Sequence, residues 1–301
     1  MTLGLAAPAN PAIDEPNQLP GTARLRARVL IPLLILASVV AAIVTAWAWP
    51  TSLDQTDAAP WPTAVGIALQ SALILLLAAR HAGRAGAGLG AALGPWRADL
   101  PVVWLAAAST ATLGLAFVST YAVFVPLSFL FPDGVRWWLF EDLPVAYSAD
   151  LPSAAAGNLV SIFGVVVLGP VAEEWFFRGL LMRRWAYKWG LAHGVIWSSL
   201  LFAIAHLDPV GGFLFAVAAC AVYAHYQSLW APVILHMAHN GLATGLMMAD
   251  AHGVPGSIQI ESVADLRALW WLPVVGAVAA APWVWHALRR WRWMSQWPAV
   301  P

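Results

Sequence analysis

The residues best suited to chemistry in this chain are two adjacent carboxylates, Glu173 and Glu174, followed by Arg178. They come at the end of an apolar run, residues 159–171, that otherwise has the composition of a membrane span. Charges placed in hydrocarbon are costly unless they are paired or face a wet cavity, so they usually mark a functional site. The sequence therefore predicts an intramembrane site around these three side chains.

Helical spacing gives the two carboxylates different tasks. Residues four apart share a face whereas neighbours diverge by about 100°, so Glu174 and Arg178 pair while Glu173 points elsewhere. An unpaired carboxylate in such a site is suited to act as a general base or acid. The preceding Gly169-Pro170 step is expected to loosen the helix and free backbone carbonyls for water. The alternative is a structural ion cluster at a helix end.

Two later apolar runs contribute further polar groups. Phe202 and His206 belong to one run, and His236 and Asn240 lie on one helical face of the other. The side chains of His236 and Asn240 can both donate hydrogen bonds to a developing oxyanion, whereas His239 is turned from their shared face and is not included. Burying these groups together costs less than burying each alone, so we expect one common site.

The elements that position these residues are membrane helices. Of the 301 residues 61% are hydrophobic and 10% charged, which excludes a soluble domain with an ordinary polar surface. The single Cys220 excludes a disulfide framework and a cysteine-based metal site. We predict an all-α, polytopic membrane protein with about eight transmembrane helices. Their approximate ranges are 29–49, 63–79, 101–131, 154 through the carboxylate motif, 192–207, 211–226, 232–248 and 268–288.

Charge distribution predicts the topology of these spans. With eight spans, alternate loops and both termini lie on the same side of the membrane. Of the fifteen Lys and Arg residues, only Arg136 and Arg267 fall outside the segments on that side. The positive-inside rule then places both termini in the cytoplasm. The predicted protein is thus a multi-pass protein of the plasma (inner) membrane. The predicted organisation is a disordered tail, a transmembrane domain with a functional core at about residues 154–250, and a C-terminal tail. The disordered tail covers residues 1–23, the transmembrane domain residues 24–292 and the C-terminal tail residues 293–301.

The fourth span must extend beyond its apolar part. If it ended at Glu173, that residue and His206 would lie about 15–20 Å apart by helical rise. The apolar residues Leu180, Leu181, Trp185 and Trp189 recur at helical spacing. We therefore expect the helix to continue through the basic segment and leave Glu173 at mid-depth.

Three motifs together resemble a known family. They are Glu-Glu-x-x-x-Arg at 173–178, Phe-x-x-x-His at 202–206 and His-x-x-x-Asn at 236–240. Their order and spacing resemble those of the CAAX-protease and bacteriocin-processing (CPBP) family of intramembrane glutamic endopeptidases. Each motif is weak by itself, and the ordered set is fairly specific.

The resemblance implies a metal-independent endopeptidase in which activated water attacks the peptide bond. It implies that Glu173 is the general base, that His206 holds the water, and that His236 and Asn240 stabilise the oxyanion. The residues that it implies as supports of the site are Glu174, Arg178 and Phe202. It implies a peptide or membrane-anchored protein as substrate and the lipid bilayer as partner, with no cofactor and no nucleic acid.

Three alternatives remain open at the level of sequence. The histidines and carboxylates are also ligands that zinc accepts, although a His-Glu-x-x-His helix is absent. A proton-coupled transporter would use intramembrane ionisable residues as a relay, but no internal repeat is apparent. A membrane scaffold or immunity protein would keep the fold without catalysis.

Overall fold

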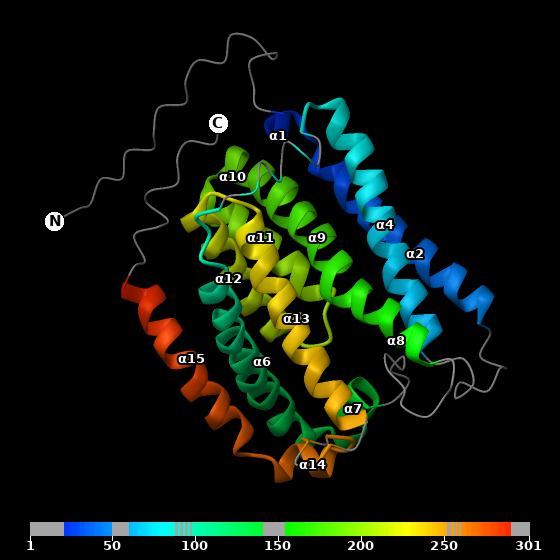
Figure 1. Ribbon diagram of the computed structural model, residues 1–301, viewed down its shortest axis with the longest axis vertical. Helices are drawn as coiled ribbons and strands as arrows, with labels where there is room; N and C mark the ends of the chain where they lie inside the picture. The colour runs from blue at the N-terminus through cyan, green and yellow to red at the C-terminus, as the bar shows by residue number, and fades with distance from the viewer. Residues whose placement is uncertain are drawn as a thin grey trace.

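Backbone hydrogen bonding dictates the secondary structure of this apolar chain. In hydrocarbon each N–H and C=O group must be satisfied within the protein, and a helix achieves this locally. The structure, a computed structural model, is accordingly all-α, without a strand in its described parts (Figure 1). It describes residues 21–49, 60–87, 90, 93, 96, 98–140, 154–251, 254–255, 257–258 and 260–289.

The apolar runs form helices close to their predicted ranges. In chain order they include α1 (Gly21–Arg24), α2 (Ala27–Ala48), α4 (Trp61–Arg84), α6 (Val102–Leu130) and α7 (Pro132–Leu139). After the helical stretch of the fourth predicted span come α11 (Leu191–Ile204), α12 (Pro209–Tyr226), α13 (Trp230–Ala251), α14 (Val263–Ala268) and α15 (Leu272–Arg289). Pro126 lies inside α6, which continues past it as one helix.

Five helices in the described part are long and apolar enough to cross a membrane, and α11 and α15 contain shorter apolar helices. These findings confirm an all-α, multi-pass membrane protein, while the count of eight spans stays a prediction. Helix α13 is not among the five. It carries His236, His239 and Asn240, and such polar side chains lower the hydropathy of a span that houses a site.

The fourth predicted span is one continuous helical stretch. It consists of α8 (Ala154–Ile162), the π-helical segment η2 (Phe163–Leu168), α9 (Gly169–Glu174), the π-helical segment η3 (Trp175–Met182) and α10 (Arg183–Trp189). This confirms that the helix extends through the basic segment. Thirty-five of its residues form a candidate span, about 50 Å long by helical rise, so it exceeds a hydrocarbon core of about 30 Å.

A local cause explains the π-helical segment before the carboxylates. The N–H of Gly169 donates to the carbonyl of Gly164, five residues back. The next residue, Pro170, has no N–H to offer to the carbonyl of Val165. The predicted loosening at Gly169-Pro170 therefore leaves the carbonyl of Val165 free as a hydrogen-bond acceptor near the site.

The helices are arranged around this long central stretch (Figure 1). Helices α2 and α4 pack together on one side of it, and α11, α12 and α13 lie on the other. Helix α6 packs against α12, α13 and the outermost helix, α15. A Cβ atom added at Gly114 of α6 or Gly276 of α15 would overlap the other's carbonyl, so this glycine pair lets the two backbones meet closely.

One end of the bundle carries more basic residues than the other. Helices α1 and α10, with Arg24, Arg184 and Lys188, lie at one end, and α7 and α14, with Arg136 and Arg267, lie at the other (Figure 1). This agrees with the charge asymmetry on which the predicted cytoplasmic termini rest, and the orientation itself stays a prediction. Residues 21–23, assigned to the predicted N-terminal tail, form part of α1, and the rest of both predicted tails lies outside the described residues.

The turn after His206 is fixed by Asp208. Its carboxylate caps α12 by accepting from the N–H groups of Val210 and Gly211. The other carboxylate oxygen accepts from Ser119 Oγ at 2.6 Å and Thr120 Oγ1 at 2.9 Å, both on α6. A capping side chain typically stabilises a helix by about 1 kcal/mol. Here the cap also joins the α11–α12 turn to α6.

Candidate active site

Glu174 lies at the centre of the polar cluster and is fully buried. Its Oε1 accepts from Arg178 Nη1 at 2.7 Å and lies 2.8 Å from His236 Nδ1. The first contact confirms the predicted pair four residues apart. Arg178, 1% exposed, also donates from Nη2 to the carbonyl of Ala216 on α12 at 3.1 Å. The carboxylate thus joins the central helix to α13, and its partner arginine joins it to α12.

These contacts determine which nitrogen of His236 carries a proton. A carboxylate oxygen that is paired with Arg178 accepts hydrogen bonds, so the Nδ1 of His236 must donate to Glu174. In the neutral ring Nε2 then has a lone pair. This Nε2 lies 3.8 Å from Glu173 Oε2, a separation that suits a bridging water or a shared proton better than a direct hydrogen bond.

Glu173 differs from its neighbour in both exposure and pairing. Its side chain is 31% exposed, whereas that of Glu174 is 0% exposed. Within the described residues its ion-pair contact is the one with His236, and no arginine or lysine neutralises it. The prediction of two carboxylates with separate tasks therefore agrees with the geometry: one is embedded in a buried network and the other is accessible.

His206 follows the end of α11 and is held against Phe202. Its Nδ1 lies 2.7 Å from the carbonyl of Phe202, and the two rings stack with centroids 4.1 Å apart. The Phe202 ring also lies 4.7 Å from the guanidinium carbon of Arg178 and 6.0 Å from the ring of His236. Phe202 thus connects the second motif to the first and third. Because a carbonyl only accepts, His206 Nδ1 donates and its Nε2 is left with a lone pair.

Asn240 turns toward the central helix. Its Nδ2 donates at 2.8 Å to the carbonyl of Val165, the acceptor freed by Pro170. Asn240 therefore satisfies the π-helical segment, and its second N–H remains available as a donor. The third motif contacts the central helix on two levels, through His236 at Glu174 and through Asn240 at Val165.

The structure adds residues that sequence reasoning missed. His239 Nδ1 lies 3.0 Å from Thr112 Oγ1 on α6, and this hydroxyl donates to the carbonyl of Ser109. Phe215 of α12 lies between the two rings, 4.6 Å from that of His236 and 4.9 Å from that of His239. Neither Thr112 nor Phe215 has a sequence signal, because single threonines and phenylalanines are common in apolar helices. Helix α6, which has no motif, thus supports the site.

The zinc alternative requires several side chains that converge on one point. Within the described residues, no group of three or more His, Cys, Asp or Glu side chains is arranged to hold a metal ion. Glu173 Oε2 and His236 Nε2 provide two donors 3.8 Å apart, whereas the Oε1 of Glu174 is already paired with Arg178. A structural or catalytic zinc site needs three or four protein ligands, and the absence of a metal cofactor stays a prediction.

The helices and the site define a multi-pass membrane protein with carboxylates and histidines gathered among its helices. Comparison with protein families is consistent with this class: residues 155–242 match the family model described as type II CAAX prenyl endopeptidase Rce1-like. The match includes all three motifs and confirms the resemblance to the CPBP family. Residues 155–242 are thus similar to a CAAX protease family domain, which supports a membrane endopeptidase. Comparisons with curated proteins and with solved structures gave no match.

Proposed function

We propose that this protein is an intramembrane endopeptidase in which Glu173 activates water. The observation that carries the proposal is the accessible Glu173 carboxylate, 3.8 Å from a nitrogen of His236 whose other nitrogen is held by Glu174. A base must be reachable by water and oriented by fixed neighbours, and Glu173 meets both requirements. The match to the CAAX protease family supports peptide-bond hydrolysis as the reaction.

In the proposed reaction, water is held between Glu173 and a histidine. One hydrogen of the water points to the Glu173 carboxylate and the other to the Nε2 lone pair of His206 or His236. As the water oxygen attacks the peptide carbonyl carbon, Glu173 takes the first proton. The tetrahedral intermediate collapses with cleavage of the C–N bond, and Glu173 returns the proton to the leaving nitrogen. The products are a carboxyl and an amino terminus, and no side chain forms a covalent intermediate.

The developing oxyanion needs hydrogen-bond donors. The free N–H of Asn240 is one, because its other N–H is bound to Val165. His236 donates from Nε2 only as an imidazolium, which the Glu174 carboxylate at Nδ1 would stabilise. The oxyanion role implied for His236 thus requires a protonated ring, and the Nε2 lone pair that holds the water is then that of His206.

The proposed substrate is a peptide or a membrane-anchored protein. The partly exposed Glu173 side chain supports access by an extended peptide to the site. Comparing the membrane and secreted peptides of a strain that lacks this protein with those of its parent should identify the substrate. Peptides that lose one defined terminus only in the parent are expected, and identical peptides in both strains would count against proteolysis.

Replacing His206 with Ala should slow cleavage of that substrate by about 10²-fold or more, the contribution of a positioned acid–base group. The variant should remain folded, because among the described residues the hydrogen bond and the ring stacking of His206 are both with Phe202, four residues earlier in the chain. Activity would be measured on purified protein in liposomes. His225→Ala, an exposed histidine near the end of α12, is the matched control and should keep its activity. A fully active His206→Ala variant would contradict the proposed role.

A chelator titration of the purified enzyme tests the proposed metal independence. Since three zinc ligands do not converge among the described residues, cleavage should persist at chelator concentrations that strip zinc proteases. The readout is the initial rate of cleavage after prolonged incubation. Inactivation that added zinc reverses would instead favour the metalloprotease.

A further inference from the structure

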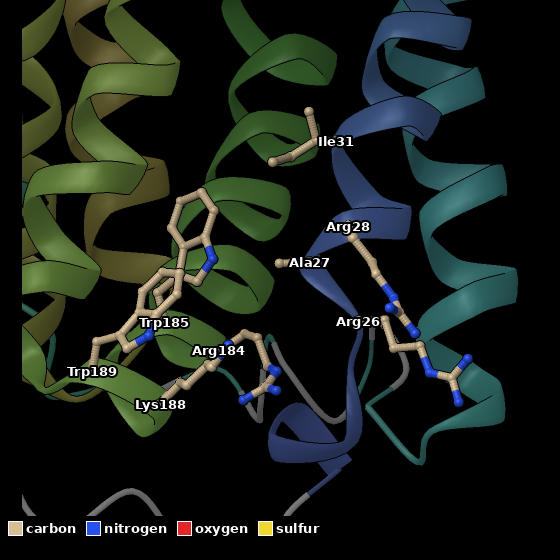
Figure 2. A pocket seen from close by; sticks show the side chains of 8 residues that line it. All are labelled: Arg26, Ala27, Arg28, Ile31, Arg184, Trp185, Lys188 and Trp189. Atoms are coloured by element: carbon tan, nitrogen blue, oxygen red, sulfur yellow. The ribbon is translucent and has the colours of Figure 1, made fainter.

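A basic pocket lies between the start of α2 and helix α10, away from the candidate active site (Figure 2). Its volume is about 500 Å³. Figure 2 shows residues of α10 on one side and residues from the start of α2 on the other, with the guanidinium of Arg184 between them. Four cationic side chains and two indole rings line it: Arg26, Arg28, Arg184, Lys188, Trp185 and Trp189.

These cations have no carboxylate partner among the residues that the structure describes. Arg184 Nε donates to the carbonyl of Leu25 at 2.5 Å, which holds the side chain at the pocket while its Nη groups remain available. The ammonium of Lys188 lies 4.9 Å from the Trp189 ring. Arg26 and Arg28 extend away from the indole rings, toward the far side of the start of α2 (Figure 2). We therefore treat Arg184 and Lys188 as the main anion contacts, with the other two arginines at the rim.

An apolar groove of about 740 Å³ continues from this pocket. Ile31, Trp185 and Trp189 line both hollows, so the two are contiguous. Beyond these shared residues the groove follows one face of α11 from His193 to Ile204. Those eleven helical steps cover about 16 Å, roughly one leaflet of a hydrocarbon core about 30 Å thick.

We propose that this composite hollow binds an anionic phospholipid. The headgroup phosphate would contact Arg184 and Lys188 in charge-assisted hydrogen bonds. One acyl chain would lie along α11 between Trp197 and Ile204. A free phosphate ion would satisfy the cations but leave the groove without an occupant, and a zwitterionic lipid would bring its own cation toward four others. An anionic headgroup with an attached acyl chain matches both parts.

The bound lipid would join two parts of the fold. Helix α2 packs mainly on α4, and the lipid would fill the space between α2 and α10–α11. Helix α10 continues directly from η3, which contains Arg178. The proposal concerns lipid binding and stands whether or not the protein cleaves peptides.

Native mass spectrometry of the purified full-length chain tests the proposal. In detergent, the protein would be titrated with dioleoylphosphatidylglycerol or with dioleoylphosphatidylcholine. We expect one phosphatidylglycerol molecule to bind roughly tenfold more tightly than phosphatidylcholine. Arg184→Gln combined with Lys188→Gln should weaken phosphatidylglycerol binding about tenfold or more and leave phosphatidylcholine binding unchanged.

A matched control removes two positive charges elsewhere. Arg80→Gln combined with Arg289→Gln affects two exposed arginines outside both hollows and should alter binding less than about twofold. Because Arg184 also contacts the backbone, Lys188→Gln alone and Leu200→Trp, which fills the groove, provide independent variants. Each should weaken phosphatidylglycerol binding in protein that unfolds at the wild-type temperature.

Inorganic phosphate distinguishes the two sources of the anion. At millimolar concentration it should not displace the bound phosphatidylglycerol, because it makes no contact with the groove. Complete displacement by phosphate would overturn the lipid assignment in favour of a free-anion site. Equal affinity for the two lipids, or an unchanged affinity in the Arg184 and Lys188 double variant, would overturn the proposal altogether.

Discussion

Replacing Glu173 with Gln should lower the rate of peptide cleavage by about 10³-fold or more. Glutamine keeps the size of the side chain but cannot take a proton from water. Its effect on folding should be small, since the Glu173 side chain is 31% exposed and has no arginine partner among the described residues. The cleavage rate would be measured with purified protein in liposomes, alongside its unfolding temperature.

The control for this variant is Glu261→Gln, which removes one exposed carboxylate before α14. It should leave both the cleavage rate and the unfolding temperature unchanged. The same substitution at Glu174 would affect folding as well, because that carboxylate binds Arg178 and His236. Cleavage at the wild-type rate by Glu173→Gln would remove the general base from the mechanism, whatever the other residues do.

The pairing of Glu174 with Arg178 follows from sequence because it is local. Four residues separate the two side chains, and any helix places them on one face. The extents of the helices are predictable for a similar reason, since apolar runs of this length must satisfy their own backbone groups. The extension of the fourth span through its basic segment was likewise predictable, from the helical spacing of Leu181, Trp185 and Trp189.

The sequence does not predict which side chains of distant helices contact each other. His236 Nδ1 meets Glu174 across 62 residues, and Thr112 meets His239 across 127. Such pairs depend on how helices rotate and cross, and hydropathy carries no information about either. Asn240 illustrates this: its predicted role was that of an oxyanion donor, whereas one of its N–H groups satisfies the carbonyl of Val165.

The buried network explains why both carboxylates belong to the same motif. Glu174 is embedded with Arg178 and fixes the ring of His236, whose free nitrogen then faces Glu173. In the proposed mechanism the first carboxylate acts on water while the second holds the ring of His236 in place. This division requires adjacent residues: one side chain points into the core and the next toward the accessible side of the helix.

Replacing Arg178 with Met should destabilise the protein by about 3–5 kcal/mol, because it leaves the Glu174 carboxylate buried without its cation. Both side chains are essentially inaccessible, at 1% and 0% exposure. The free energy of unfolding would be measured by denaturant titration in mixed micelles, with Arg80→Met, an exposed arginine on α4, as the matched control.

The double variant Glu174→Leu with Arg178→Met distinguishes the effect of losing the whole ion pair from the effect of leaving one charge unpaired. It removes both charges at once, so most of the lost stability should return, as is common when a buried ion pair is replaced by apolar side chains. Cleavage should nevertheless stay low, since His236 would lose the acceptor at its Nδ1. Stability recovered together with full activity would mean that Glu174 does not orient the histidine. A single Arg178→Met variant as stable as the wild type would mean that the buried charge has another partner.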